Sequence, residues 1–329
     1  MRMLKRAARL FLEKSYPPAA AAVNAVLPPF IVLAYHRVAD LARDPQLLAV
    51  SRENFASQLG WMAENNIEVV RFDEPWKARC PRVRACITFD DGYADNYHNA
   101  LPILEKYAFP ATFFVTTGHV RTGNAYWWDV LEHILYEELP DAPPPGPFAA
   151  VWPAPPEKLY QAAHGILLAA GPEKQRELLE GLCHWLGHPV AADESHRPLR
   201  PDEVAALAAH PLATVGAHTH THPRLSQLSR PQQKLEVETS LDLLAEWTGR
   251  RPSVFAYPFG SRGLLGRGGD YNADSMRVCK ELGLLRAAAN YPAQVRPWTN
   301  RFAVPRHLVR NWDKATFARR FAAFLTEGY

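Results

Sequence analysis

Short apolar runs alternate along the chain with segments of helical period. Residues 30–35 read FIVLAY and residues 110–116 read PATFFVT, which is typical of strands buried on both faces. Residues 52–65 instead place apolar side chains three to four positions apart, as on one face of a helix. This alternation predicts parallel strands joined by right-handed helical crossovers. Further strands are expected at residues 67–70, 84–89, 212–217, 253–257, 284–288 and 303–309, and further helices at residues 99–107, 202–209, 232–248 and 272–282.

The alternation is interrupted between about residues 121 and 200. Seven or eight strand–helix units remain outside this stretch, which predicts a closed parallel α/β barrel that carries a helical insertion. We expect the barrel to occupy residues 30–329, after an N-terminal helix and connector at residues 1–29. Within the insertion, helices are expected at residues 126–135, 157–170 and 173–186, with a Pro-rich loop at residues 140–156.

The composition is that of an ordinary soluble globular protein, with 47% hydrophobic and 22% charged residues among 329. The net charge is only +3 and no basic stripe is interleaved with aromatic residues, so we expect no nucleic-acid partner. The four cysteines form no C-x-x-C pair, which predicts free thiols, mostly buried, and favours a reducing compartment. They are Cys80, Cys86, Cys183 and Cys279.

The N-terminus combines basic side chains with an apolar helical face. Such a helix could rest on an anionic membrane, and a plain surface helix is the alternative. Glu13 and Lys14 interrupt the apolar part, so it makes a poor secretory signal, and no stretch is long enough to span a bilayer. We therefore expect a cytoplasmic protein or one peripheral to the inner membrane. The basic residues are Arg2, Lys5, Arg6 and Arg9, and the apolar face is formed by Leu4, Ala7, Ala8 and Phe11.

Two adjacent carboxylates follow the strand predicted at residues 84–89. Asp90 and Asp91 stand directly before Gly92 in the sequence ITFDDGYADN. Neighbouring like charges are costly unless a cation or a shared proton compensates them. Gly92 permits a sharp turn that could bring both carboxylates toward one pocket. A solvated Asp-Gly turn is the simpler alternative.

Three histidines lie within five residues in the segment TVGAHTHTHP at residues 214–223. On one helical turn His218 and His222 would share a face and could bind one divalent ion, while His220 would point away. Two imidazoles and a carboxylate, with positions left for water, form the usual catalytic metal site. A lone histidine is more often a core or surface side chain, but this cluster after an apolar strand favours the metal site. Thr219 is expected to brace the loop.

Three segments in this order, TFDDG, H-T-x-x-H-P and FAYPFG at residues 255–260, resemble the polysaccharide deacetylases of carbohydrate esterase family 4, the NodB-homology domain. The resemblance covers about residues 31–309. The early Tyr35-His36 pair, together with FAYPFG, resembles the members that act on exopolysaccharides. The family implies a distorted (β/α) barrel of about seven strands and a metal-dependent hydrolase that acts on non-peptide carbon–nitrogen bonds. It would remove N-acetyl groups from amino sugars of a bacterial exopolysaccharide or its precursor.

The resemblance also implies roles for the clustered side chains. Asp91 would complete the metal site with His218 and His222, and the ion would be zinc, with cobalt or nickel as alternatives. Asp90 would be the general base, and the backbone N–H of Tyr93 would stabilise the oxyanion. The substrate partner would be an acetylated polysaccharide or oligosaccharide.

The general acid has two candidates, because the family's late L-x-H motif is replaced here by VPRHLV. We prefer His36 as the acid, with His307 as the alternative. Neighbours on a strand point to opposite sides, so only one of Arg306 and His307 can face the pocket. Tyr257 replaces the arginine usual in the third motif, and Arg306 could orient Asp90 in its place.

Aromatic side chains suggest where the sugar would bind. Tyr257, Pro258 and Trp127 are candidate substrate contacts, whereas Trp128 is more readily explained as a structural anchor. The Gly-rich run at residues 260–269 lacks the strand–G-x-G-x-x-G–helix context of a nucleotide site.

Several other functions can be compared with these motifs. A glycosidase would need two carboxylates about 5 Å or more apart across the bond, and it would leave His218 and His222 without a role. O-deacetylation, hydrolysis of a non-sugar amide or linear C–N bond, and a catalytically weak carbohydrate-binding remnant remain as alternatives.

Overall fold

A parallel sheet forms the centre of the protein. The computed structural model describes residues 29–325, except for residue 75 and residues 77–81, 137–138, 188–193 and 264–267. The strands follow the order β10-β1-β5-β6-β7-β8-β9, and β4 pairs with the start of β5. An isolated parallel bridge from Ala288 to Val304 links β9 to the segment that leads into β10, so the sheet curves back toward its first edge. The strands are β1 (Phe30–Tyr35), β4 (Glu68–Val69), β5 (Arg84–Phe89), β6 (Ala111–Val115), β7 (Ala213–Ala217), β8 (Val254–Ala256), β9 (Arg286–Ala288) and β10 (His307–Leu308).

Side chains alternate between the interior of the curved sheet and its outer face. Val32, Cys86 and Phe114 belong to one buried cluster, whereas the adjacent Leu33 and Ile87 belong to the larger cluster under the helices. Because successive residues of a strand point to opposite sides, the position of one residue fixes those of its neighbours. The predicted distorted α/β barrel is confirmed.

Helices cover the outer face of the sheet. They are α2 (Arg52–Glu64), α3 (Leu101–Tyr107), α8 (Pro201–Ala209), α9 (Arg230–Thr248), α10 (Ala273–Glu281) and α11 (Lys314–Phe324). The sequence analysis missed α11, which packs against α2 with the Phe317 ring 5.7 Å from that of Trp61. Its phenylalanines at positions 317, 321 and 324 have helical spacing, and this signal could have revealed it.

The helix after the two carboxylates differs from its prediction. A π-helical turn, η1 (Asn96–Ala100), precedes α3, so the helical segment begins before Asn99. The side chain of Asn99, inside this turn, donates to the carbonyl oxygen of Val38 at 2.8 Å. The short pair β2 (Arg37–Val38) and β3 (Ala49–Val50) was not predicted either.

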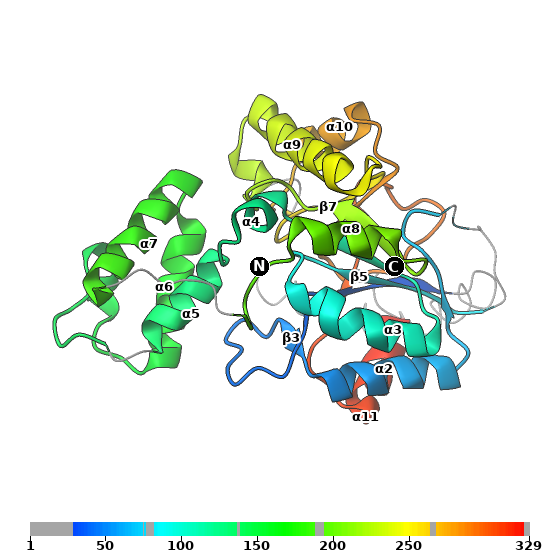
Figure 1. Cartoon of the computed structure of the whole chain (residues 1–329), viewed down its shortest axis with the longest axis horizontal. Helices are drawn as coiled ribbons and strands as arrows, with labels where there is room; N and C mark the ends of the chain where they lie inside the picture. Colours follow the sequence, from blue (N-terminus) through cyan, green and yellow to red (C-terminus); the bar gives the residue numbers. More distant parts are fainter. Residues whose placement is uncertain are drawn as a thin grey trace, which may run out of the picture.

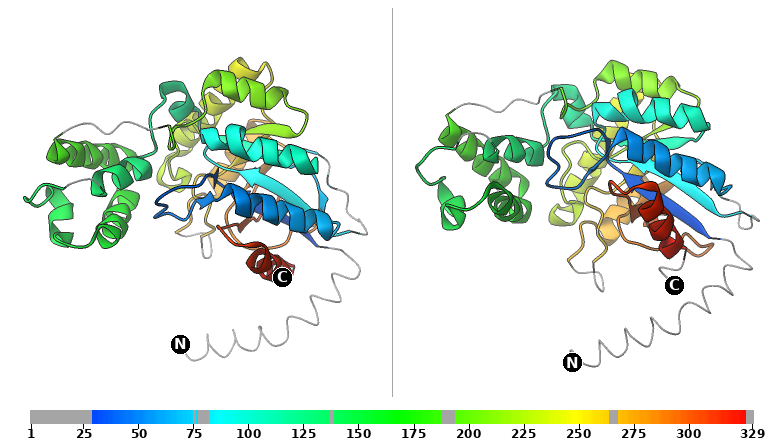
Figure 2. Two further views of the ribbon diagram at one scale, coloured as in Figure 1. Left: turned by 60° about the horizontal axis from the view of Figure 1, so that its bottom comes forward. Right: turned by 90° about the horizontal axis from the view of Figure 1, so that it is seen from below.

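The helical insertion forms a lobe beside the barrel (Figures 1 and 2). Its elements are α5 (Trp127–Leu135), the 3-10 turn η2 (Gly146–Val151), α6 (Pro156–Ala169) and α7 (Pro172–Leu186), and α4 (Thr117–Thr122) connects it to β6. The lobe has its own buried cluster, which includes Leu131, Phe148, Tyr160 and Leu167. The predicted helices at residues 157–170 and 173–186 correspond to α6 and α7.

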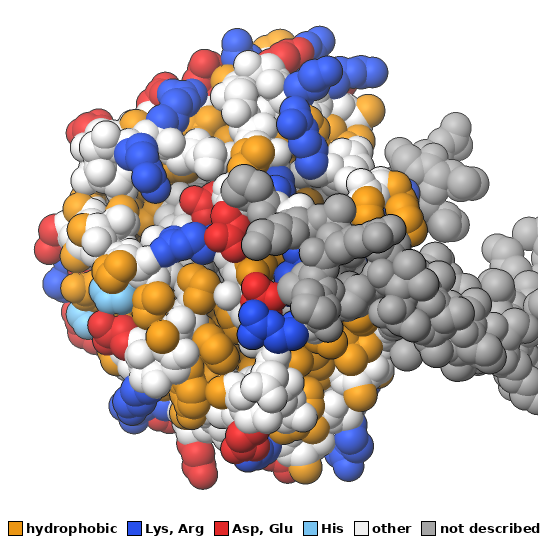
Figure 3. All heavy atoms as spheres, turned by 90° about the vertical axis from the view of Figure 1, so that its right-hand side faces the viewer, with side chains coloured by type: hydrophobic (Ala, Val, Ile, Leu, Met, Phe, Trp, Pro, Cys, Tyr) orange, Lys and Arg blue, Asp and Glu red, His pale blue; other side chains and the backbone are white. Residues whose placement is uncertain are grey.

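Among the described residues, no helix has both the length and the apolar character needed to cross a bilayer. The face shown in Figure 3 carries lysine, arginine and acidic side chains interspersed with hydrophobic ones. Cys86 and Cys279 are buried free thiols, and Cys183 in α7 is half-buried. The N-terminal helix, its membrane contact and Cys80 lie outside the described residues.

Candidate active site

A strained turn presents the two carboxylates at the end of β5. The N–H of Gly92 donates to the carbonyl oxygen of Asp90 at 2.9 Å, and Asp91 between them has φ +73°. This is the rare form of γ-turn, and a non-glycine residue adopts it only where its surroundings enforce it. A Cβ on Gly92, at φ +86°, would lie 3.1 Å from Val115 Cγ1. The turn places Asp91 beside the histidines after β7, as the sequence suggested.

The histidine segment is a loop and not the helical turn that the spacing of His218 and His222 had suggested. β7 ends at Ala217, and Thr219 and His222 then adopt left-handed conformations at φ +64° and +61°. The Thr219 hydroxyl donates to the carbonyl oxygen of His218 and accepts the N–H of His222 at 3.1 Å. Thr219 therefore braces the loop, as expected, although the backbone geometry is different.

His220 points away from the other two histidines, as predicted, although no helix is responsible. Its Nδ1 lies 3.0 Å from the hydroxyl of Thr117. The carboxylate of Glu236 in α9 accepts the N–H groups of His220 and Thr221 at 3.0 and 2.8 Å. Glu236 thus fixes the outer side of the loop whose inner side carries His218 and His222.

Asp91, His218 and His222 converge on one point. The Nε2 atoms of His218 and His222 lie 3.5 and 3.3 Å from Asp91 Oδ1, and all three side chains are buried. His218 Nδ1 lies 2.8 Å from the carbonyl oxygen of Ala256, which orients the ring. Burial raises the pKa of Asp91, but pairing with the two imidazoles outweighs it and holds that pKa well below its usual range. Two nitrogen atoms and one ionised oxygen so arranged fit a divalent ion.

Asp90 forms a buried ion pair with Arg306. The guanidinium Nη1 donates to Asp90 Oδ1 at 2.7 Å and Nη2 to Oδ2 at 2.5 Å, and both side chains are at most 1% exposed. Burial raises the pKa of Asp90, but Arg306, followed by His218, outweighs it, so the pKa lies below its ordinary value. Arg306 thus occupies the position suggested for orienting Asp90.

The two candidate acids lie in different places. The half-buried His36 follows β1, where burial lowers its pKa while Asp91 and Asp90 act to raise it. His307 faces the other way: its ring stacks on Phe324 with 4.1 Å between centroids, and Nε2 lies 3.1 Å from the carbonyl oxygen of Ala293. Strand alternation therefore sends Arg306 into the site and His307 out of it, which removes His307 from the candidates.

The burial of His307 predicts a pH-dependent stability. Burial lowers the pKa of His307 to about 4, so the unfolded chain binds the proton more readily below its ordinary value of 6.5. Stability is then lost as the pH falls from 6.5 toward 4. We expect His307→Gln to reduce the loss of unfolding free energy between pH 7.5 and pH 5 by about 1–2 kcal/mol, measured by urea denaturation. An unchanged loss in the variant would contradict the assignment.

Two of the three predicted substrate contacts are not accessible. Tyr257 is fully buried, donates to the carbonyl oxygen of Phe302 at 2.9 Å and stacks on Tyr271, so it belongs to the core under α10. Pro258 is also buried. The strand alternation explains the error, because Ala256 faces the barrel interior and its neighbour Tyr257 must face the helices.

Phe259, which the sequence analysis missed, reaches the site instead. With φ +58° it turns back so that its ring lies 4.9 Å from that of His222. It lines a small cavity with His222 and Trp127, the third predicted contact. Trp128 is an anchor, as expected, since its Nε1 donates to the hydroxyl of Tyr93 at 2.8 Å. No local sequence signal marks Phe259, because its position depends on a left-handed loop residue.

Tyr93 follows the two carboxylates and is fully buried. Its hydroxyl donates to Asp129 Oδ2 at 2.7 Å. Its backbone N–H donates to no acceptor among the described residues, whereas the neighbouring N–H groups of Gly92 and Ala94 are both bonded. An N–H without an internal acceptor beside the ion site is available to a ligand.

Gly118 in α4 allows the histidine loop to approach closely. Its N–H donates to the carbonyl oxygen of His220 at 2.7 Å, and a Cβ would lie 2.5 Å from that oxygen. We expect Gly118→Ala to lower the unfolding free energy by about 1–3 kcal/mol and to weaken binding of the divalent ion. The control is Gly165→Ala in α6, where no atom lies within 4 Å and a gain of about 0.5–1 kcal/mol is expected. Chemical denaturation measures the unfolding free energy of each variant, and metal titration measures its affinity for the ion. Wild-type values of both quantities in Gly118→Ala would refute the close contact.

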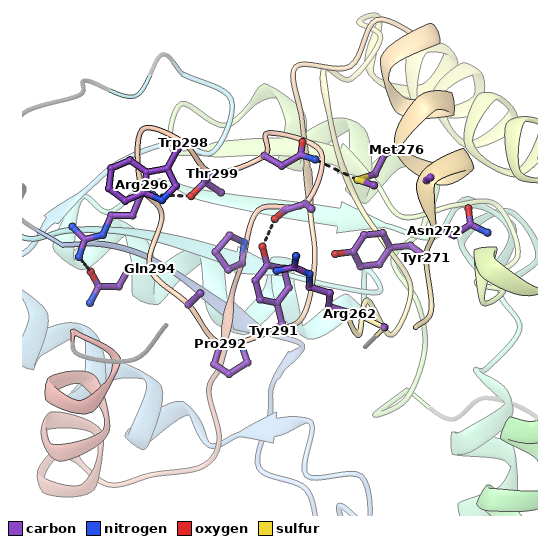
Figure 4. A pocket seen from close by; sticks show the side chains of 16 residues that line it. Arg262, Tyr271, Asn272, Met276, Tyr291, Pro292, Gln294, Arg296, Trp298 and Thr299 are labelled. Atoms are coloured by element: carbon purple, nitrogen blue, oxygen red, sulfur yellow. Dashed lines mark hydrogen bonds between the residues drawn. The ribbon is translucent and has the colours of Figure 1, made fainter. Parts of the chain in front are cut away.

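A large cavity of ≈ 1100 Å³ lies elsewhere, between the start of α10 and the loop of residues 291–303 (Figure 4). Tyr271 and Met276 line one side of it, and Tyr291 and Trp298 line the other. The guanidinium of Arg262 lies 5.2 Å from the centre of the Tyr291 ring. None of the predicted site residues lines this cavity, so it is separate from the cluster of carboxylates and histidines.

Comparisons with known proteins agree with this arrangement. A sequence profile described as polysaccharide deacetylase matches residues 77–141 and 174–287, which together exceed half of the chain. The match is interrupted over residues 142–173, which contain α6. Both the two carboxylates and the histidine loop lie inside the matched segments.

The poly-beta-1,6-N-acetyl-D-glucosamine N-deacetylase of Staphylococcus aureus strain N315 is 34% identical over 95 residues, which cover 28% of this chain and 33% of that protein. The Staphylococcus epidermidis protein of the same name is 30% identical over 129 residues, covering 33% of this chain and 43% of that protein. The chain thus spans less than half the length of these relatives.

Solved structures share the fold. IcaB from Ammonifex degensii superposes with a TM-score of 0.55 at 20% identity, covering 91% of this chain and 97% of that one. The Streptococcus pyogenes deacetylase PplD, in complex with acetate, gives a TM-score of 0.54 at 17% identity, covering 89% and 98%.

Proposed function

Because the chain belongs to the polysaccharide deacetylase family, we propose that it removes N-acetyl groups from the amino sugars of a bacterial exopolysaccharide or its precursor. The reaction is hydrolysis of a non-peptide carbon–nitrogen bond. One observation carries the proposal: a carboxylate, Asp90, lies beside a compact set of ion ligands at the C-terminal edge of a parallel sheet, where barrel enzymes place their chemistry. The curated relatives support the choice of an N-acetylated amino sugar.

Asp91, His218 and His222 would hold the ion in this scheme. When bound, a divalent ion supplies Lewis acidity, which polarises an amide carbonyl and lowers the pKa of a coordinated water. The donor set suits zinc, with cobalt or nickel as alternatives.

The remaining side chains move protons and hold the substrate. Asp90, kept ionised by Arg306, accepts the proton of the attacking water. The N–H of Tyr93 donates to the acetyl oxygen as it gains negative charge. His36 then protonates the amine nitrogen as the C–N bond breaks, and acetate and the free amino sugar leave. Trp127 and Phe259 line the wall beside His222 and would contact the sugar or its acetyl group.

Acetate release tests the proposal. The chain is treated with a chelator, reloaded with zinc, cobalt or nickel, and incubated with β-1,6-linked N-acetylglucosamine oligomers. We expect acetate and free amino groups in equal amounts, and none without added metal. O-acetylated glycans and simple N-acetylated amines serve as controls. Release only from O-acetylated glycans or simple amides, or no release with any metal, would overturn the proposal.

The role of His36 predicts a dependence on the leaving group. An amide must be protonated at nitrogen, whereas 4-nitrophenyl acetate releases an anion that needs no proton. We therefore expect His36→Gln to lower kcat about 10²-fold for the N-acetylated oligomer and less than about threefold for the ester. Equal losses with both substrates would assign His36 a role other than proton donation.

A further inference from the structure

A second cluster of metal-binding side chains lies where the helical lobe joins the barrel. Asp129 and Glu132 stand one turn apart on α5, and His196 belongs to the segment that returns from the lobe. Their exposed fractions are 4%, 6% and 7%. One ligand atom from each lies within 4.8 Å of the other two. All three line a cavity of ≈ 10 Å³, which has room for one water molecule or one ion and nothing larger.

We propose that this cavity binds a divalent cation through Asp129, Glu132 and His196, separately from the ion of the catalytic centre. Carboxylate oxygens and an imidazole nitrogen are ligands that zinc and manganese accept in proteins. The proposal does not depend on the deacetylase reaction.

The charges around the cavity favour a cation over a water molecule. Two buried carboxylates face it. Burial raises the pKa of Asp129 to about 8, and a bound cation, unlike a water molecule, would stabilise the ionised form of this carboxylate. Arg43 contributes one positive charge, with Nε 3.6 Å from Glu132 Oε1, but its side chain is 48% exposed and therefore well solvated. Arg37 also lines the cavity, and its charge is balanced by Asp95 at 3.0 Å.

The other groups around the cavity leave this balance unchanged. Asp44 uses both carboxylate oxygens to accept the N–H groups of Leu48 and Ala49. Gln46 and the hydroxyl of Tyr160 bond to each other at 3.0 Å. The ring of His133 packs edge-on against that of His196, with 5.3 Å between centroids. Among the described residues, none of these groups forms an ion pair with Asp129.

The ligands are held in place by further hydrogen bonds. Asp129 Oδ2 accepts the hydroxyl of Tyr93 at 2.7 Å, and His196 Nδ1 lies 2.7 Å from the hydroxyl of Ser195. Ligands in metal sites are oriented in this way by neighbouring polar groups.

The position of the cluster indicates that a bound ion would stabilise the junction between the helical lobe and the barrel. It would connect α5, where the lobe begins, to the segment around His196, where the lobe ends. That segment pairs directly with the turn after the catalytic carboxylates. The N–H of Ala94 donates to the carbonyl oxygen of Arg197, and the N–H of Leu199 donates to that of Gly92. An ion at Asp129 would therefore restrain Tyr93, whose N–H has no acceptor among the described residues.

Ion counting tests the proposal without measuring activity. Native mass spectrometry and titration with Zn²⁺ or Mn²⁺ alone are applied to the full chain and to a variant without the catalytic ligands, Asp91→Asn/His218→Gln/His222→Gln. We expect two ions in the full chain and one in the variant. At 100 times its Kd, that ion should raise the variant's unfolding temperature by about 5 °C. Adding Glu132→Gln and His196→Gln should remove both the remaining ion and the shift.

A matched control excludes adventitious binding at surface histidines. His98 pairs with Glu203 at 2.6 Å but is 50% exposed, and His98→Gln should leave both ion counts unchanged. In native mass spectrometry, folded molecules carry fewer charges than unfolded ones, so ions are counted in the folded molecules alone and reduced stability of a variant does not obscure the result. One ion in the full chain with none in the variant lacking the catalytic ligands, or an ion that persists after Glu132→Gln and His196→Gln, would overturn the proposal.

Discussion

Asp90→Asn should abolish most acetate release and leave ion binding unchanged. The amide keeps the shape of the carboxylate, and Arg306 can still donate to Asn Oδ1, but the variant cannot take a proton from water. Removal of a general base typically costs about 10²–10⁴ in rate, and we expect about 10³-fold in kcat. Because Asp91 is the carboxylate beside both histidines, the stoichiometry of the catalytic ion should stay at the wild-type value.

The comparison is made by acetate release and metal analysis on the same preparation. Asp274→Asn is the control, since Asp274 is a 40% exposed aspartate of α10 paired with Arg277 at 2.7 Å. It should retain full activity. Activity of Asp90→Asn within tenfold of wild type would show that another group accepts the proton.

Arg306→Met should produce the largest loss of stability among single substitutions at the site. It leaves the Asp90 carboxylate buried at 1% exposure without its bidentate partner. Breaking a buried ion pair from one side costs about 3–5 kcal/mol, because the remaining charge is uncompensated. The variant should also lose activity, since Asp90 would bind a proton more readily and no longer be oriented.

A double-mutant cycle measures the interaction energy between Asp90 and Arg306. With chelator present to remove bound ions, Asp90→Asn/Arg306→Met should be more stable than Arg306→Met alone, because no unpaired charge remains. Arg224→Met is the matched control: Arg224 pairs with Asp270 at 3.0 Å but is 28% exposed, so about 1 kcal/mol is expected. If urea denaturation showed that Arg306→Met lowers the unfolding free energy no more than Arg224→Met does, the ion pair between Arg306 and Asp90 would not have the proposed effect on stability.

The periodicity of the sequence predicted the alternation of parallel strands and helices, because buried strands and amphipathic helices leave distinct patterns, whereas the distortion of the barrel was implied by the family resemblance. Alternation along the last strand also predicted that only one of Arg306 and His307 could face the carboxylates. The same rule, applied to β8, would have placed Tyr257 in the core. That error came from following the family motif in place of the strand geometry.

The conformations of the loops around the site could not be predicted from the sequence. Thr219 and His222 adopt left-handed conformations that β-branched and bulky residues rarely take, so local propensity favours other geometries there. Surrounding contacts, including Glu236 and the close approach of Gly118, enforce the shape. Phe259 likewise reaches the site because it adopts a left-handed conformation in a loop. Such positions follow from tertiary packing and have no signature in neighbouring residues.

The attachment of the helical lobe has an evolutionary consequence. Its two ends are fastened to the same few residues: Tyr126 donates to the carbonyl oxygen of Asp91 at 2.6 Å, and Leu199 donates to that of Gly92 at 2.8 Å. Because the lobe also has its own apolar cluster, it can be exchanged as a cassette without re-routing the chain between β6 and β7. Grafting a homologue's lobe at these two points should keep the barrel folded, and acetate release should persist only where the graft retains the contacts of Trp128 and Asp129 with Tyr93.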